Sequence, residues 1–328
     1  DNEPALWAST HAKLHPAALT YAELLSRTIE AAAMIKALSP KAIVLGPVLY
    51  GYTAYINLQD APDAGEHGDF LSYYLDRLES EEATRQQRLV DVLDLHWYPE
   101  ARGGGVRIIG TETGAAVVAA RLQAPRSLWD PSYVEESWIT DCCVEGGIDL
   151  LGGLKKRIAL HYPGTKLSFS EYYYGAGQHI SGAIAQADVL GIFGREGVFA
   201  ATLWPLDDKL AFIHAAFKLF LDFDGAGGRF GDTSVEALTN DDAKSSVYAS
   251  VDAADPGRMV LVLLNKTNGV LDAALTIQHS LAFTQAALFR VSGSSPAIQT
   301  LAPLSLEQTN AFNLSLPPMS VTTVLLTP

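Results

Sequence analysis

The feature that most constrains the fold is a repeated alternation of short apolar runs with helical stretches over the first 225 residues. The runs are KAIVLGPV (41–48), VDVLDLHWYP (90–99), KLSFSEYYYG (166–175) and VFAATLWP (198–205). Apolar residues at helical spacing fill the segments 20–38, 70–89, 184–193 and 211–223, and 133–161 reads as helix with loops. Strands separated by helices pair in parallel through right-handed crossovers. The sequence therefore predicts an α/β domain built on a parallel sheet.

The helix over 20–38 has recognisable ends. Thr20 stands at an N-cap position with Glu23 three residues later, and Pro40 follows the last apolar residue. A Thr and Glu at this spacing satisfy each other's free backbone N–H groups, and a proline cannot continue a helix. This stretch predicts a helix with a defined start and stop.

The pattern changes after Gly225, where GAGGRFGDT interrupts it. Strand-like runs follow at hairpin spacing with no helical pattern between them: 245–252, 257–266, 272–278, 284–291 and 320–327. Such runs are typical of antiparallel sheets. We expect two domains, an α/β domain over residues 1–225 and an all-β sandwich of roughly 100 residues over 226–328.

Charge and hydropathy exclude several partners. The chain of 328 residues carries 37 Asp and Glu against 23 Lys and Arg, a net charge of −14. A surplus of negative charge repels nucleic-acid phosphates and anionic membrane surfaces. No run approaches the roughly 18 apolar residues that a membrane span needs. We expect neither nucleic acid nor a membrane as a partner. The acidic start shows no signal-peptide pattern.

The two cysteines, Cys142 and Cys143, are adjacent. Disulfides between neighbouring residues are uncommon because the geometry is strained. We therefore expect two free thiols and no disulfide framework.

Chemically active residue types gather at the ends of the predicted strands. In a parallel α/β fold, ligands bind at the carboxyl ends of the strands. These positions hold Glu3, Tyr50, His96, Trp97, Tyr98, Glu171 and Trp204. Glycosidic bonds are cleaved by two carboxyl groups, one donating a proton and one attacking or stabilising the sugar carbon. Aromatic rings stack on the apolar faces of sugars. The rim predicts a site for a neutral saccharide.

Each of these residues also has a purely structural interpretation. Glu3 in Asn-Glu-Pro could be a helix N-cap followed by proline. His96 could be a hydrogen-bonded core histidine, and Trp204 could cap the core. For Glu171, alternation along LSFSEYYY places the carboxylate on the face of Leu167 and Phe169, where burial is costly unless the group is paired or used. This argument favours a functional role for Glu171.

Five motifs, NEPALW, GPVLYG, LDLHWYP, FSEYYYG and AATLWP, resemble in this order glycoside hydrolase family 44 of clan A. SLWDPSYVEESWI (127–139) and ADVLGIFGREGV (187–198) are also similar to that family. The resemblance implies a (β/α)8 TIM barrel joined to a β-sandwich. It also implies a secreted, retaining endo-β-1,4-glucanase acting on cellulose-type β-glucans, xyloglucan or xylan.

The resemblance assigns roles to the rim residues. Glu3 corresponds to the acid/base and Glu171 to the nucleophile, so their carboxyl groups are expected about 5–5.5 Å apart. Asn2 would hydrogen-bond the 2-hydroxyl of the cleaved sugar, and Trp204 would stack on that sugar. His96 and Tyr98 would orient the nucleophile and the substrate. The remaining expected substrate contacts are Tyr50, Trp97 and Tyr172.

The chain departs from the family pattern at its start. The predicted strands correspond to barrel strands five to eight, with a further strand expected to run into Asp1. Four parallel strands cannot close an eight-stranded barrel. We therefore expect only the second half of a barrel in this sequence.

An acidic loop gives a weaker prediction. Asp60, Asp63, Glu66 and Asp69 could offer oxygen ligands to a structural Ca²⁺, although a solvated acidic loop is an equal alternative. No cofactor is expected to be required, and the expected state is a monomer. Two other functions stay open: a non-catalytic polysaccharide-binding protein, and a xylan- or mannan-directed hydrolase on the same fold.

Overall fold

The computed structural model describes residues 2–306 and 308–328. It contains two compact units that interleave along the chain. The first unit comprises residues 1–98, 149–173 and 198–204, and the second comprises 99–148, 174–197 and 205–328. The predicted domain boundary after residue 225 stays a prediction. The strand expected to run into Asp1 concerns a residue outside the described part of the chain.

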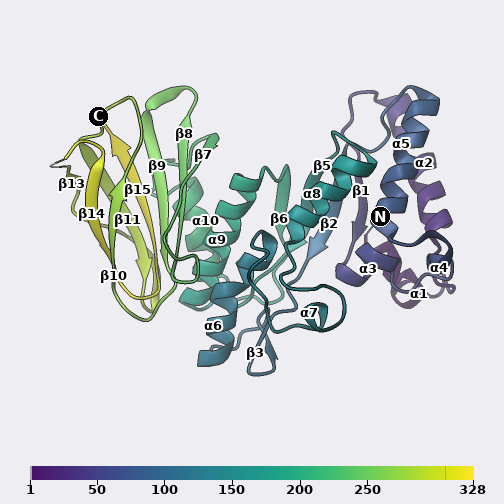
Figure 1. Cartoon of the computed structure of the whole chain (residues 1–328), viewed down its shortest axis with the longest axis horizontal. Helices are drawn as coiled ribbons and strands as arrows, with labels where there is room; N and C mark the ends of the chain where they lie inside the picture. Colours follow the sequence, from purple (N-terminus) through teal and green to yellow (C-terminus); the bar gives the residue numbers. More distant parts are fainter. Residues whose placement is uncertain (1, 307) are drawn as a thin grey trace. The chain divides into compact units, whose positions relative to one another are not determined.

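The first unit is built on a parallel sheet of four strands in the order β1-β2-β5-β6 (Figure 1). The strands are β1 (Leu45–Leu49), β2 (Val92–Trp97), β5 (Lys166–Tyr172) and β6 (Ala200–Leu203). All three pairings are parallel. Each strand lies inside or within one residue of a predicted apolar run, and the predicted parallel sheet is confirmed.

The first unit also contains six helices and one 3₁₀ turn among its described residues. They are α1 (Trp7–Thr10), α2 (Tyr21–Leu38), α3 (Tyr52–Asn57), α4 (Ala64–His67), α5 (Phe70–Arg85) and α8 (Leu150–His161), with the 3₁₀ turn η1 (Pro4–Leu6). Thr20 caps α2 by accepting the N–H of Glu23 at 3.1 Å, as the sequence predicts. Helix α5 contacts α2, α3 and α8, so these four helices pack together.

Two strands of this sheet contain one extra residue. Between Phe169 and Glu171 the pairing of β5 with β2 shifts by one residue, and the pairing with β6 shifts over the same stretch. Strand β1 shifts in the same way at Val48 against β2. Such bulges re-aim side chains and are common beside active sites. Both lie near the carboxyl end of the sheet.

The first segment of the second unit includes residues 100–127, where the sequence patterns predict no helix or strand. The structure holds a short hairpin there, β3 (Arg102–Gly103) with β4 (Val106–Arg107), followed by α6 (Ala115–Gln123) and η2 (Ala124–Leu128). The guanidinium of Arg121 is buried and donates to the carbonyls of Ile108, Gly110, Glu112 and Tyr174. These backbone contacts order the segment, which local sequence patterns do not reveal.

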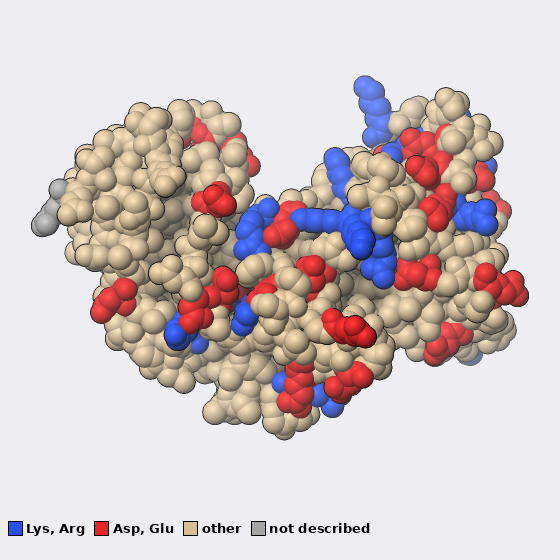
Figure 2. Space-filling view, viewed as in Figure 1, with Lys and Arg blue, Asp and Glu red and all other residues tan. Residues whose placement is uncertain are grey.

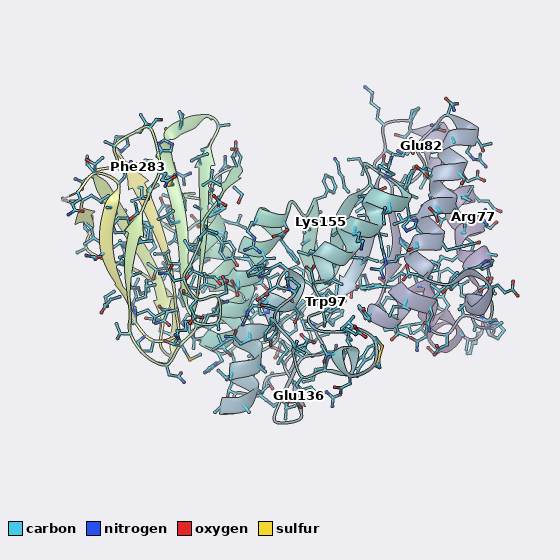
Figure 3. All side chains as sticks on the ribbon, viewed as in Figure 1. Arg77, Glu82, Trp97, Glu136, Lys155 and Phe283 are labelled. Carbon is cyan, nitrogen blue, oxygen red and sulfur yellow. A yellow bond between two sulfur atoms is a disulfide. The ribbon has the colours of Figure 1, made fainter. Side chains whose placement is uncertain are left out.

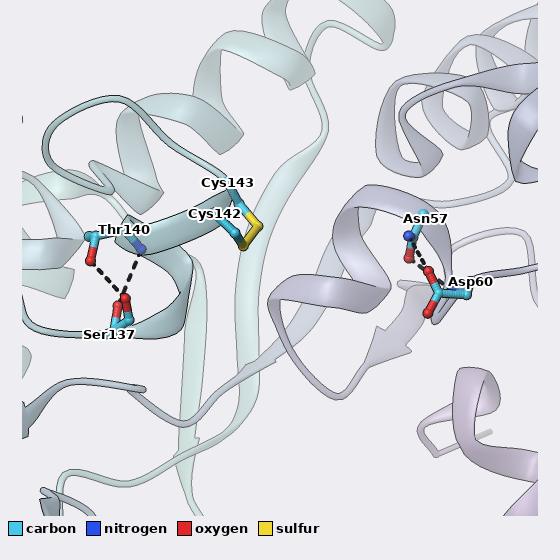
Figure 4. Close-up of a disulfide and its surroundings, with 6 residues drawn as sticks. All are labelled: Asn57, Asp60, Ser137, Thr140, Cys142 and Cys143. Carbon is cyan, nitrogen blue, oxygen red and sulfur yellow. Dashed lines mark hydrogen bonds between the residues drawn. A yellow bond between two sulfur atoms is a disulfide. The ribbon is translucent and has the colours of Figure 1, made fainter. Parts of the chain in front are cut away.

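The expectation of free thiols is wrong. Cys142 and Cys143 form a disulfide at the end of α7 (Trp138–Cys142), as Figure 4 shows. The helix starts at Ser137, whose hydroxyl accepts the N–H of Thr140, and it ends at Cys143. Cys143 already has non-helical dihedral angles. The side chains of Cys142 and Cys143 are therefore not spread around the helix axis as those of successive helical residues are.

The rest of the second unit contains α9 (Ile180–Glu196), α10 (Ala211–Leu221) and an antiparallel β-region. Its larger sheet has the order β12-β11-β15-β9-β8-β7, with β13 paired to β11, and a smaller sheet pairs β10 with β14. The strands are β7 (Thr233–Val235), β8 (Ser245–Asp252), β9 (Asp255–Asn265), β10 (Leu271–Thr276), β11 (Gln285–Ser292), β12 (Ser295–Thr300), β13 (Leu304–Ser305), β14 (Ala311–Leu316) and β15 (Ser320–Thr327). The predicted β-region is confirmed.

The two sheets enclose a core that includes Leu261, Leu263, Phe283, Leu288 and Leu316. Phe283, labelled in Figure 3, is fully buried there. The opposite face of β9 and β15 contacts α9, and β15 also contacts α10. Burial on both faces explains why β9 reads as a continuous apolar run instead of an alternating one.

No helix in the described part of the chain is long and apolar enough to cross a membrane. On the face shown in Figure 2, acidic and basic side chains are interspersed among a larger number of neutral residues.

Candidate active site

Glu3 approaches the parallel sheet through its backbone. Its N–H donates to the carbonyl of Val48, the extra residue of β1, at 3.0 Å. Glu3 is the N-cap residue of η1 and Pro4 occupies the first position, as the structural interpretation of Asn-Glu-Pro predicts. The Glu3 side chain, however, makes no capping hydrogen bond. Its backbone adopts a left-handed conformation (φ 44°), and the carboxylate is directed to His96.

The bulge in β5 determines where Glu171 points. Asp94 and His96 are two residues apart in β2 and share one face. Asp94 binds the Ser168 hydroxyl, and His96 lies beside Glu171. Ser168 and Glu171 therefore face the same way although they are three positions apart, which an unbulged strand would not allow. The prediction that Glu171 shares the face of Leu167 and Phe169 is wrong, because it assumed regular alternation.

Four side chains meet at this face of the sheet. His96 Nδ1 lies 2.9 Å from Glu3 Oε1 and 3.4 Å from Glu171 Oε2. The Tyr98 hydroxyl donates to Glu171 Oε2 at 2.7 Å. One carboxylate oxygen of Glu3 lies within 4.8 Å of one of Glu171. The two carboxyl groups are thus close enough to act on the two sides of a single bond.

The hydrogen positions in this cluster follow from the acceptors. Nδ1 of His96 faces two carboxylate oxygens and therefore carries the hydrogen. Nε2 is buried and has no hydrogen-bond partner among the described residues. Burial, followed by the hydrogen bond to Glu171, raises the pKa of Tyr98 above its usual range, so the phenol keeps its hydrogen and donates it.

Glu3, His96 and Glu171 are the one group of His, Cys, Asp and Glu in the described chain whose atoms lie close enough together for a metal ion. The 2.9 Å contact between Nδ1 and Glu3 is the length of a charge-assisted hydrogen bond. A hydrogen shared between nitrogen and oxygen accounts for the spacing without an ion.

The predicted aromatic contacts divide into two sets. Trp204 follows β6 and is 57% exposed, and Tyr50 is half-buried, with its hydroxyl donating to Gln59. Both are accessible at the carboxyl ends of their strands. Trp97, labelled in Figure 3, and Tyr172 are each 1% exposed. These two residues pair with each other across β2 and β5 and are buried, so their predicted contact with substrate is not supported.

The acidic loop does not gather its four carboxylates around one point. Asp63 accepts the N–H groups of Tyr21 and Ala22 at the start of α2. Asp69 caps α5 and pairs with Arg157, and Asp60 accepts from Asn57 (Figure 4). None of these three, nor Glu66, belongs to a group of metal-ligand spacing within the described residues. The structural calcium ion stays a prediction, and the separate positions of these carboxylates do not favour it.

Two residues that support the site were not predicted from the sequence. Asp94 is a charged residue in the centre of the buried strand VLDLHW, and it accepts hydrogen bonds from the Ser168 hydroxyl and the Ser170 N–H. A carboxylate in such a buried run must receive hydrogen bonds from buried donors. The charged residue in an apolar run was therefore the sequence feature that could have indicated this supporting role. Tyr55, whose hydroxyl donates to the carbonyl of His96, gave no comparable signal.

Comparison with known proteins places this geometry in a context. The profile of glycoside hydrolase family 44 matches residues 1–101. Endoglucanase A of Paenibacillus lautus is 41% identical over 99% of the chain. The chain spans 47% of that relative's length.

Solved structures give the same result. The chain is similar to Cel44A, a family 44 endoglucanase from Clostridium thermocellum, at 41% identity and a TM-score of 0.96. A family 44 xyloglucanase from Paenibacillus polymyxa, solved with xyloglucan, is 40% identical at a TM-score of 0.96. The matches cover 99% and 100% of this chain and 65% of each of the solved chains.

Proposed function

Because the chain belongs to glycoside hydrolase family 44, we propose that the protein containing it is a retaining endo-β-1,4-glucanase. The observation that carries the proposal is the separation of the two carboxyl groups, with one oxygen of each within 4.8 Å. Retaining glycosidases hold their carboxyl groups about 5–5.5 Å apart, whereas inverting enzymes leave about 6.5–9.5 Å for a water molecule.

Glu171 is the proposed nucleophile. Its Oε2 receives the hydrogen bond from Tyr98 and lies beside Nδ1 of His96. Oε1 is therefore the oxygen that attacks the sugar carbon. In the first step a bond forms between Oε1 and that carbon, and the bond from the carbon to the leaving sugar oxygen breaks.

Glu3 is the proposed acid and base. Its Oε1 accepts from His96, so the proton that it donates to the leaving oxygen is carried by Oε2. In the second step Glu3 takes a proton from water while the resulting hydroxide attacks the sugar carbon and releases Glu171. The product keeps the configuration of the substrate.

Neighbouring residues would bind the polysaccharide. Trp204 presents an exposed ring that suits stacking on a sugar, and Asn2 precedes the acid/base on an exposed segment. We propose that Asn2 hydrogen-bonds the 2-hydroxyl, a contact that strengthens in the transition state. The two relatives named endoglucanase and xyloglucanase make β-1,4-glucans the first substrates to test.

The remaining barrel strands are proposed to come from chain beyond this sequence. The sheet ends at β1 and β6, and the chain covers 65% of the solved relatives. We also propose that the protein is secreted, since disulfides such as Cys142–Cys143 persist in oxidising compartments.

The test uses the full-length protein with carboxymethylcellulose, xyloglucan, xylan and mannan as substrates. Wild type is expected to release reducing ends of retained configuration, measured by NMR of early products. Glu171→Gln and Glu3→Gln are each expected to abolish hydrolysis while oligosaccharide binding persists. An inactive wild type that binds oligosaccharides would instead make the protein a polysaccharide-binding protein. Inverted products would contradict the assigned roles.

A further inference from the structure

One histidine nitrogen serves both carboxylates of the site. His96 Nδ1 lies 2.9 Å from Glu3 and 3.4 Å from Glu171, and it carries a single hydrogen. That hydrogen can be fully aligned with only one of the two acceptors at a time. The carboxylates are therefore coupled through the His96 ring as well as through their direct repulsion.

The two acceptors depend on His96 to different degrees. Glu171 Oε2 also receives the Tyr98 hydroxyl at 2.7 Å, the shorter of its two contacts. For Glu3 the structure gives His96 as the side-chain donor. Without the His96 hydrogen, Glu171 would keep the Tyr98 hydroxyl as a donor. Glu3 would lose its hydrogen bond from His96.

The ring is held in place without being fixed by a second hydrogen bond. The His96 side chain is 1% exposed, and the Tyr55 hydroxyl fixes its backbone carbonyl. Nε2 has no hydrogen-bond partner among the residues described. A small ring rotation can therefore align Nδ1–H more fully with Glu3 without breaking a contact at Nε2.

We infer that His96 is a positioning residue whose hydrogen bond to Glu3, the shorter of its two contacts, strengthens when the glycosyl-enzyme forms. This inference rests on the proposed retaining function. In the first step Glu171 becomes a neutral ester while Glu3 gives up its proton and becomes a carboxylate. A hydrogen bond to a charged acceptor is stronger, so the bond from Nδ1–H to Glu3 strengthens once Glu3 is a carboxylate. It then holds Glu3 as the base that accepts a proton from water.

The inference predicts a defect that falls on the second step. Aryl β-cellobiosides with a dinitrophenolate leaving group need no proton donor in the first step, so the rates of the two steps can be separated. In full-length His96→Gln, a burst of dinitrophenolate is expected, followed by turnover reduced about 10- to 100-fold, the range of one lost charge-assisted hydrogen bond. Azide should restore turnover and give a glycosyl azide, because its attack requires no proton removal.

Asparagine at residue 96 is the matched control. Its amide nitrogen can occupy the place of Nδ1, whereas the longer glutamine side chain places its amide near Nε2. His96→Asn is therefore expected to recover most of the turnover. Tyr98→Phe, which removes a donor to Glu171, is expected to slow the burst and not the step after it.

Several results would overturn the inference. One is equal loss of burst rate and turnover in His96→Gln, and another is the absence of azide rescue. Failure of His96→Asn to exceed His96→Gln, with both variants unfolding at the wild-type temperature, would also overturn it. The Glu3 and Glu171 variants test the proposed function separately: if they remain active, the retaining mechanism itself fails.

Discussion

Asp94 in β2 and Ser168 in β5 are joined by a hydrogen bond of 2.7 Å, and the same carboxylate oxygen accepts the N–H of Ser170 at 3.0 Å. Ser170 lies in the stretch where β5 carries its extra residue. Asp94 thus binds the bulge that turns Glu171 to the face of His96. It supports the proposed site through these two hydrogen bonds to β5.

We expect Asp94→Ala to lower both the stability and the activity of the full-length protein. The buried Ser168 hydroxyl and the partly buried Ser170 N–H would lose their acceptor. A buried donor left unsatisfied costs about 1–3 kcal/mol. The relaxed bulge should also lower kcat at least tenfold, measured on an aryl cellobioside. Ser168→Ala removes one donor and keeps the Ser170 contact, so kcat should change less. Full kcat in folded Asp94→Ala would contradict the proposed support of the bulge.

Removal of Lys266 is expected to be strongly destabilising. Its ammonium lies 2.7 Å from Asp188, and both side chains are 1% exposed. Lys266→Met leaves Asp188 buried without its counter-charge, which costs about 3–5 kcal/mol in the free energy of unfolding. Denaturant unfolding measures this change.

The surface pair Lys244–Asp241 is the control for Lys266. It has a similar N to O distance of 2.8 Å, but Lys244 is 63% exposed. Lys244→Met should cost no more than about 1 kcal/mol. Asp188→Asn added to Lys266→Met should recover part of the loss by removing the unpaired charge. Equal effects of the two lysine variants would contradict the role of burial.

Two glycines of α9 are expected to respond in opposite directions to alanine. A Cβ at Gly191 would lie 2.2 Å from a ring atom of Tyr248, whereas a Cβ at Gly194 would meet nothing within 4 Å. Gly191→Ala should lower the free energy of unfolding by about 1–3 kcal/mol through overpacking. Gly194→Ala should raise it by up to about 1 kcal/mol, because alanine favours the helix. A neutral Gly191→Ala would show that the Tyr248 ring can move aside.

Glu135 should give stability a pH dependence. Burial raises its pKa above the ordinary value, opposed by hydrogen bonds from Ser127 and Ser137 and reinforced by the charge of Glu100. When the folded-state pKa of a carboxyl group is raised, the protonated group contributes stability that is fully present below the ordinary carboxyl pKa. This contribution is lost as the pH rises through the folded-state pKa. Glu135→Gln cannot ionise. Its stability relative to wild type should therefore increase between pH 4 and pH 7, measured by denaturant unfolding at each pH. A constant difference would contradict the assignment.

Local sequence patterns predicted most of the secondary structure because their causes are local. The Thr20 cap of α2, the apolar run of β9 and the strand β15 over 320–327 were found from residue spacing alone. The strand-end rule also selected Glu3, His96, Tyr98 and Glu171, which the structure brings together.

The tertiary structure decided which way these side chains point. Alternation along LSFSEYYY places Glu171 with Phe169, but pairing with two neighbouring strands inserts an extra residue and reverses that placement. The burial of Trp97 and Tyr172, the support from Asp94, and the contact between the Cys142 and Cys143 sulfur atoms also depend on neighbours distant in sequence or on local backbone geometry. Residue types and periodicity determine which elements form. Strand pairing and packing determine which groups face one another, because these depend on contacts that no local window contains.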